Sequence, residues 1–189
     1  MAKGETQFLA LLRGINVGGK NIIAKDDLRG CFEDLGYSNV RTYIQSGNIL
    51  FFAAGPGTKT ATAKLTSAIE SALSKRFSYD AQAVVISHAK YKTAIKAAPE
   101  NWGTDDDCKH NALFTLSSTT PKRVLGQLDE PKPEIETVTA GPGVIFWSAT
   151  KQAITKTTLM KLAKHPAYQQ VTVRNHNTVY KLLELLEQG

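Results

Sequence analysis

Two successive halves of the chain have the same order of predicted strands and helices, and this repeated order limits the fold more than any other feature. Apolar residues at strand spacing alternate with apolar residues at helix spacing. In each half the order is strand, helix, strand, strand, helix, strand, helix. The elements cover residues 8–12, 26–35, 40–45, 49–52, 62–77, 82–86 and 88–98, then 112–116, 120–128, 135–139, 144–148, 155–166, 170–173 and 179–186.

The order βαββαβ is that of the ferredoxin-like motif. The sequence therefore predicts an α+β fold of tandem ferredoxin-like βαββαβ units, each with an extra C-terminal helix. We expect a first subdomain over residues 1–98, a linker over 99–110 that contains proline, glycine and three aspartates, and a second subdomain over 111–189. Nearly continuous apolar runs such as residues 8–12 predict strands that are buried on both faces, with the second face covered by the extra helix or by the other copy.

The composition is that of a globular chain and argues against a membrane-spanning or a disulfide-rich protein. Of the 189 residues, 42% are hydrophobic, and no apolar run approaches the ~20 residues that a membrane helix needs. Residues 1–6 lack an apolar signal segment, which favours a cytoplasmic protein with no membrane partner. The two cysteines, Cys31 and Cys108, define no disulfide framework.

Charge is distributed unevenly between the halves. Residues 1–98 contain 13 Lys and Arg against 7 Asp and Glu, whereas residues 99–189 contain 10 of each, so the net charge of +6 lies in the first half. A basic half favours an anionic partner, from a small phosphate to nucleic acid. A solvated basic surface without a partner is the alternative reading.

A glycine-rich stretch follows the first predicted strand, with the sequence RGINVGGKN over residues 13–21. Its glycines permit sharp turns and close approach of backbone N–H groups to a ligand, and Arg13 and Lys20 add positive charge. The stretch nearly matches the phosphate-binding loop GxxxxGK[ST], but Asn21 lacks the hydroxyl that ligates magnesium, and the next helix begins too late. A looser phosphate or carboxylate site and a tight turn whose asparagines bond the backbone both remain open.

Two further polar segments lie at strand ends. Ser46-Gly47-Asn48 has the composition of a hairpin turn, and Arg174-Asn175-His176-Asn177 follows a strand of the second half. The four histidines show no metal-ligand spacing, so we expect no metal site. No nucleophile motif occurs, and neither a catalytic residue nor a cofactor follows from the pattern.

Three segments together resemble one protein family: LLRGINVGGKN (residues 11–21), VRTYIQSGN (40–48) and VRNHNTVYKL (173–182). They resemble the bacterial family named domain of unknown function 1697, in the order and spacing of that family. The resemblance implies two ferredoxin-like α+β subdomains and supplies no reaction. One departure is His176, where the family usually has tryptophan.

Our leading hypothesis is a protein that binds a small phosphate- or carboxylate-bearing ligand at the corner 13–21. The candidate ligand-binding residues are Arg13, Gly14, Asn16, Gly18, Gly19, Lys20, Asn21, Ser46, Asn48, Arg174, Asn175 and Asn177. Arg13 would make a bidentate contact, Lys20 would act as a point charge, and the asparagines would orient the ligand. The alternatives are a nucleic-acid-binding module that uses the basic first half, and a structural or interaction domain without a ligand.

Overall fold

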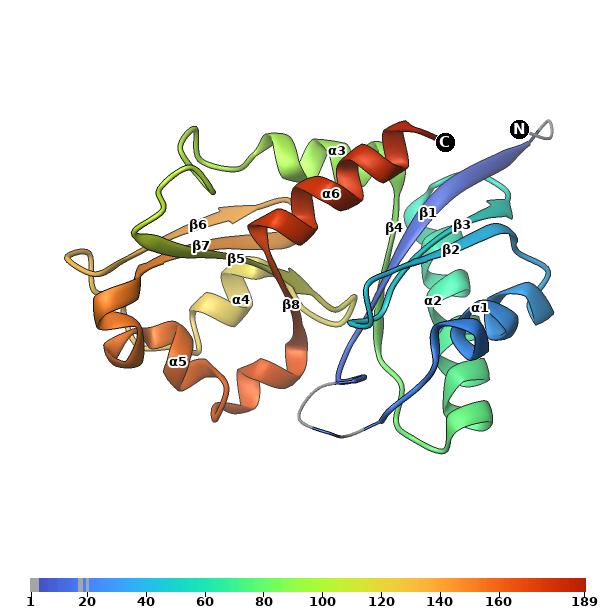
Figure 1. Cartoon of the computed structure of the whole chain (residues 1–189), viewed down its shortest axis with the longest axis horizontal. Helices are drawn as coiled ribbons and strands as arrows, with labels where there is room; N and C mark the ends of the chain where they lie inside the picture. The colour runs from blue at the N-terminus through green and yellow to red at the C-terminus, as the bar shows by residue number, and fades with distance from the viewer. Residues whose placement is uncertain (1–3, 17–18, 20) are drawn as a thin grey trace. The chain divides into compact units, whose positions relative to one another are not determined.

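The structure is a computed structural model that describes residues 4–16, 19 and 21–189. It contains two four-stranded antiparallel sheets accompanied by helices, which makes the fold α+β, as predicted (Figure 1). The chain divides into two compact units, one formed by Met1–Tyr91 with Leu183–Gly189 and the other by Lys92–Leu182. The two units are described separately below.

The sheet of the first unit has the strand order β2-β3-β1-β4, and every neighbouring pair is antiparallel. Helices α1 and α2 lie on one face of this sheet (Figure 1). The element bounds are β1 (Glu5–Leu12), α1 (Lys25–Asp34), β2 (Ser38–Tyr43), β3 (Asn48–Ala54), α2 (Lys59–Phe77), β4 (Ala83–Ser87) and α3 (His88–Lys96). The central strand β1 extends past the end of β4, because Phe8 is the first of its residues to pair with β4, opposite Ser87.

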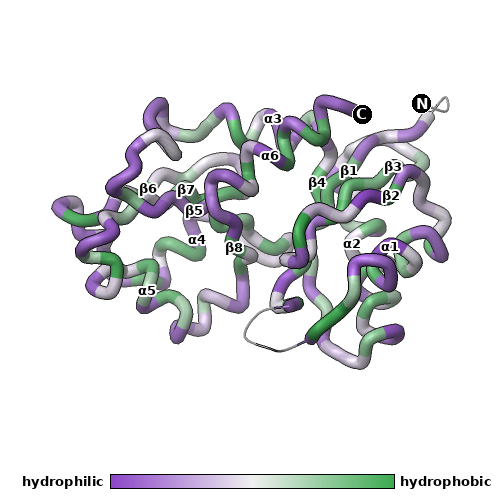
Figure 2. The backbone as a smooth tube through the Cα atoms, viewed as in Figure 1, coloured by the Kyte–Doolittle hydropathy of each residue, from purple (hydrophilic) through white to green (hydrophobic). Residues whose placement is uncertain are grey.

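Aromatic rings form the centre of the first core. The ring of Phe51 on β3 stacks on Phe8 of β1 at 5.7 Å and meets Phe32 of α1 edge-on at 5.3 Å. Residues 8–12 and 48–53 are buried without interruption, so β1 and β3 are covered on both faces, as their apolar runs predict. In Figure 2 the helices alternate between hydrophobic and hydrophilic segments, as amphipathic helices do.

The sheet of the second unit has the corresponding order β6-β7-β5-β8. Its core gathers Leu113, Val124, Ile145 and Trp147 between the sheet and the short helices. The bounds are β5 (Cys108–Thr115), α4 (Pro121–Leu125), β6 (Glu136–Gly141), β7 (Val144–Thr150), η1 (Lys151–Lys156), α5 (Thr158–Leu162), η2 (Pro166–Gln170), β8 (Val171–Asn175) and α6 (His176–Glu187).

Several predicted elements of the second half have other bounds in the structure. A helix lies inside the range predicted over 155–166, but it is short: the 3₁₀ segment η1 comes first, and α5 begins at Thr158, where the side chain of Thr157 accepts a hydrogen bond from the N–H of Met160. The helix predicted over 120–128 ends at Leu125. The strand predicted from residue 112 begins at Cys108, inside the stretch predicted as a linker, where Trp102 is also buried.

The two extra helices directly follow the last strands, α3 after β4 and α6 after β8. The end of α6 belongs to the first unit, where the guanidinium of Arg41 on β2 donates a hydrogen bond to the backbone oxygen of Leu185 at 3.2 Å. The residues of α3 from Lys92 onward belong to the second unit. The subdomain limits 1–98, 99–110 and 111–189 stay predictions.

Candidate functional site

The glycine-rich loop connects β1 to α1 and contains several residues whose backbone is in the left-handed conformation. Gly14 (φ 70°), Asn16 (φ 51°), Gly19 (φ 75°) and Asn21 (φ 48°) all have positive φ, which glycine adopts freely and asparagine tolerates. Three members of the predicted stretch, Val17, Gly18 and Lys20, lie outside the described residues.

The asparagines of the loop bind backbone groups of the loop itself and of the turn between β2 and β3. The amide nitrogen of Asn16 donates to the backbone oxygens of Ile23 at 3.1 Å and Gln45 at 2.7 Å, and its amide oxygen accepts from the N–H of Ile23 at 2.9 Å. The amide nitrogen of Asn21 donates to the backbone oxygen of Gly14 at 2.8 Å. Both hydrogens of the Asn16 amide are therefore used, and this side chain shapes the loop instead of pointing donors at a ligand.

The hairpin turn between β2 and β3 lies against the same loop. The backbone oxygen of Gly47 accepts a hydrogen bond from the N–H of Leu12 at 2.8 Å. Asn48 is buried, and its amide nitrogen donates to the backbone oxygen of Tyr43 and to the hydroxyl of Ser46, both at 3.0 Å. The structure thus brings the Ser46–Asn48 turn next to the glycine-rich loop, which the order of elements alone did not determine.

The two residues after Arg13, Gly14 and Ile15, have backbone N–H groups that no described hydrogen bond uses. Arg13 is half-buried, and its N–H donates to the backbone oxygen of Gln82 at 2.9 Å. Gly14 is left-handed whereas Ile15 is not. Within the described part of the chain, no hydrogen bond uses the N–H of Gly14 or of Ile15. Two adjacent N–H groups without a hydrogen bond are thus left at this turn, and Ile15 as a whole is 1% exposed.

The predicted residues of the second half lie in β8 and at the start of α6. Arg174 is buried, and its guanidinium donates to the Thr172 hydroxyl and to the backbone oxygen of Val173, both at 2.8 Å. The side-chain oxygen of Asn175 accepts from the N–H of Thr178 at 2.8 Å and so caps α6. Asn177 is exposed. Arg174 and Asn175 therefore already have partners inside the second unit.

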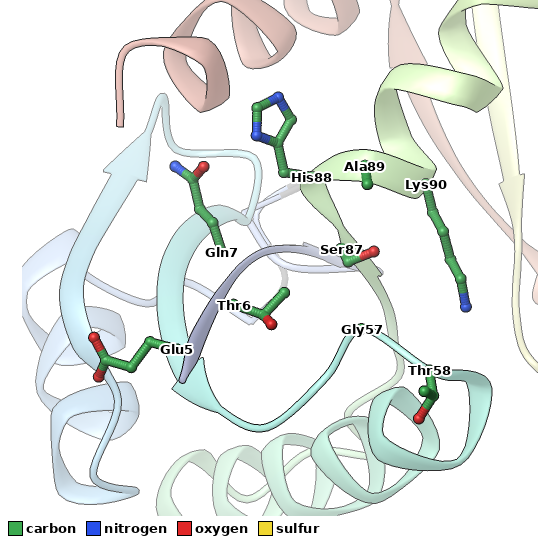
Figure 3. Close-up of a pocket in the computed structure, with 9 residues that line it drawn as sticks. All are labelled: Glu5, Thr6, Gln7, Gly57, Thr58, Ser87, His88, Ala89 and Lys90. Atoms are coloured by element: carbon green, nitrogen blue, oxygen red, sulfur yellow. The ribbon is translucent and has the colours of Figure 1, made fainter. Parts of the chain in front are cut away.

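Sequence reasoning missed a cavity of about 530 Å³ at the other end of β1. It is lined by the first residues of β1, by Gly57 and Thr58 ahead of α2, and by residues 87–90 at the junction of β4 and α3 (Figure 3). These segments are distant in the sequence and carry no recognised motif. The signal that could have indicated this end of β1 is its first three residues, Glu5, Thr6 and Gln7, which are polar and precede an apolar run.

The described residues contain neither a candidate metal site nor a candidate membrane-spanning helix. No group of three or more His, Cys, Asp or Glu side chains among residues 4–16, 19 and 21–189 is arranged to hold a metal ion. In the same residues, no helix combines the length and the apolar character that crossing a membrane requires.

Comparison with known proteins agrees with this α+β architecture of two antiparallel sheets and polar loops. The model of the family "Protein of unknown function (DUF1697)" matches residues 6–146, and the chain belongs to this family. The solved structure of the conserved bacterial protein SP0830 from Streptococcus pneumoniae is similar, with a TM-score of 0.84 and 28% sequence identity over 97% of this chain and 99% of that one. No curated protein matches.

Proposed function

We propose that the protein binds a small anionic ligand at the glycine-rich corner, residues 13–21. The observation that carries the proposal is the pair of backbone N–H groups on Gly14 and Ile15, which no hydrogen bond of the described chain uses. They follow Arg13 directly, so a ligand oxyanion at these donors is close to a cationic residue. An oxyanion is the ligand that two adjacent N–H donors and a guanidinium recognise together.

The asparagines have a supporting part in this proposal. Asn16 and Asn21 link described residues at the two ends of the loop, through hydrogen bonds to Ile23 and Gly14, before a ligand arrives. A preformed site loses less conformational entropy on binding than a flexible one. Lys20, by its position in the sequence, supplies a further positive charge.

The experiment is a titration followed by the backbone amide signals in NMR spectra, with inorganic phosphate and propionate as probes. We expect saturable shifts of the Gly14 and Ile15 signals. Replacing Arg13 by Gln, or Lys20 by Ala, should weaken binding. A Gly143→Ala variant is the control, because Gly143 is also left-handed (φ 74°) but lies in the second unit.

Unchanged Gly14 and Ile15 signals at saturating probe would reject the proposal and leave the corner as a self-bonded turn. Equal binding by the wild-type protein and both charge variants would reject it as well. In either case the third hypothesis, a domain whose polar segments only build turns, becomes the better account of this loop.

We also propose that each unit is a ferredoxin-like unit. Support comes from the strand orders β2-β3-β1-β4 and β6-β7-β5-β8, which place the first and third strands of each set at the centre of an antiparallel sheet. Separate expression of residues 1–98 and 99–189 tests the proposal, because the second piece then keeps Trp102 and all of β5, and an independent subdomain unfolds cooperatively on its own.

A further inference from the structure

A row of three paired residues crosses the sheet of the second unit from a buried position to an exposed one. Ser148 on β7 pairs with His110 on β5 and, on its other side, with Thr137 on β6. Residues directly opposite each other in an antiparallel sheet project from the same face, so the three side chains are neighbours. His110 is 4% exposed, Ser148 is half-buried and Thr137 is exposed. The opposite face of β7 carries the buried Trp147, so Ser148 is exposed on the face where its own side chain lies.

The hydrogen bonds of His110 determine which ring nitrogen carries the proton. Nε2 lies 2.9 Å from the backbone oxygen of Asp105, and Nδ1 lies 2.8 Å from the hydroxyl oxygen of Ser148. A carbonyl oxygen can only accept, so the proton of the neutral ring is on Nε2. Nδ1 is then an acceptor, and the hydroxyl of Ser148 donates to it. An imidazole in this position can remove the proton from a serine that attacks a substrate.

Asp105 orients the ring of His110 and favours its charged form. The N–H of Asp107 and the thiol of Cys108 donate to the Asp105 carboxylate and hold its pKa below the usual value, and the charge of His110 lowers this pKa further. The same attraction stabilises the imidazolium that forms when His110 accepts a proton. A nucleophile, a base in hydrogen-bond contact with it and a third group that orients the base together indicate nucleophilic catalysis.

Aromatic rings hold the base in place. The rings of His176 and Trp102 meet the ring of His110 edge-on, with centroid distances of 5.3 Å and 6.2 Å. Contacts on the ring and hydrogen bonds at both nitrogens keep Nδ1 directed at Ser148, and such fixed geometry is what a reacting pair needs. Because Thr137 is exposed, the serine can be reached from the side of β6.

The first unit has no such pair at the corresponding position. Ser148 is the fifth residue after the left-handed Gly143, as Phe52 is the fifth after the left-handed Gly47. Phe52 pairs with Gln7 across β3 and β1. The pair of hydroxyl and imidazole is therefore a property of the second unit and not a requirement of the repeated fold.

We propose that Ser148 is a nucleophile that His110 activates, and that the second unit cleaves small carboxylic esters at this pair. Oγ of Ser148 forms a bond to the ester carbonyl carbon while its proton moves to Nδ1 of His110. The bond from that carbon to the alcohol oxygen then breaks, and the alcohol oxygen takes the proton from Nδ1. Water attacks the acyl group in turn and gives a proton to His110, and the proton returns to Ser148 as the acid leaves. The site does not depend on the function proposed for residues 13–21, which belong to the first unit.

The first test is labelling of the full chain with diisopropyl fluorophosphate, followed by mass spectrometry of its peptides. The serine oxygen bonds to phosphorus and fluoride leaves, so an activated serine is marked. We expect one adduct, on Ser148, and no adduct in Ser148→Ala. His110→Gln should slow the labelling about a hundredfold, a usual contribution of a general base. Thr137→Ala and Ser118→Ala are the matched controls, because each removes an exposed hydroxyl of the second unit, and both should be labelled like the wild-type protein.

The second test measures the release of p-nitrophenol from p-nitrophenyl acetate, which Ser148→Ala should abolish while its circular dichroism stays that of the wild type. No adduct, or an adduct on another residue, would overturn the proposal, as would labelling of a folded His110→Gln at the wild-type rate. If His110→Gln does not fold, the nitrogen NMR signals of the wild-type ring decide, since a neutral ring with its proton on Nδ1 would overturn the role of the base and a proton on Nε2 supports it. Labelling of Ser148 without turnover of the acetate would overturn the ester as substrate.

Discussion

Asn16 and Ile23 close the glycine-rich loop through a reciprocal pair of hydrogen bonds. The Asn16 amide oxygen accepts from the N–H of Ile23 at 2.9 Å, and its nitrogen donates to the backbone oxygen of the same residue at 3.1 Å. The side-chain amide of Asn16 thus makes the two hydrogen bonds to Ile23 that a paired backbone residue would make in a β-bridge. The pair fixes the position of Asn16, a residue with positive φ, relative to Ile23.

Replacing Asn16 by Ala should destabilise the first unit by about 2 kcal/mol, because three hydrogen bonds are lost and alanine is strained at φ 51°. Urea denaturation measures this change. Asn39→Ala is the control for backbone strain alone, since Asn39 is exposed and has φ 49°. Equal losses of stability in the two variants would contradict a role for the hydrogen bonds.

Local patterns predicted those parts of the fold that local interactions determine. Leu28, Cys31 and Phe32 have the spacing of a helix face, and all three are buried on α1. The helix predicted over 155–166 is shorter in the structure, where Glu136, far away in the sequence, accepts hydrogen bonds from the backbone N–H and hydroxyl of Thr158, the first residue of α5. The spacing of apolar residues in the sequence gives no indication of this contact, because its two residues are far apart in the chain.

The candidate site divides in the same way. The sequence indicated the left-handed turns at Gly14 and Gly47, because glycine at a strand end is a local signal. It could not show that the amide of Asn16 is used by the backbone, which depends on folded geometry. The cavity at the start of β1 depends on the unequal lengths of two strands, which no residue pattern records.

Replacing Gly47 by Ala should cost more than the same change at Gly143, although the two residues have nearly equal φ angles of 73° and 74°. A Cβ at Gly47 would lie 2.8 Å from the Cβ of Leu12 and 2.9 Å from Cδ1 of Ile15, whereas a Cβ at Gly143 meets nothing within 4 Å. We expect about 1 kcal/mol from strain at Gly143 and about 2 kcal/mol more from overpacking at Gly47. Thermal and urea unfolding of both variants test the difference, which vanishes if the turn can move away.

Replacing Glu136 by Gln should destabilise the second unit by about 2 kcal/mol, although the shapes are alike. The buried carboxylate accepts hydrogen bonds from the indole N–H of Trp147 at 2.8 Å, the N–H of Lys132 at 3.1 Å and the N–H and hydroxyl of Thr158. An amide presents hydrogens to some of these donors and leaves them unpaired. Urea denaturation with Trp fluorescence measures the loss, and Glu134→Gln, at an exposed position, is the control.

The contribution of Glu136 to stability should depend on pH. Burial acts to raise the pKa of this carboxyl group, but the hydrogen bonds from Thr158, Lys132 and Trp147 outweigh it, so the pKa lies below the usual 4.5. The folded state therefore binds a proton less readily than the unfolded state. The stabilisation is complete above about pH 4.5 and is lost as the pH falls through the lower folded pKa. The stability gap between wild type and Glu136→Gln should shrink over this range, and a constant gap would contradict the argument.

His176 should titrate below the usual histidine value of 6.5. Burial is the largest cause of the lowered pKa, and the neighbouring His110, whose ring centroid lies 5.3 Å away, lowers the pKa further. Because the unfolded chain takes up the proton more readily, stability is complete above pH 6.5 and falls as the pH drops toward the lower folded pKa. An NMR titration of the ring signals gives the midpoint, and His176→Phe should remove its share of the pH dependence. A midpoint at or above 6.5 would show that the ring cluster does not disfavour the charged form.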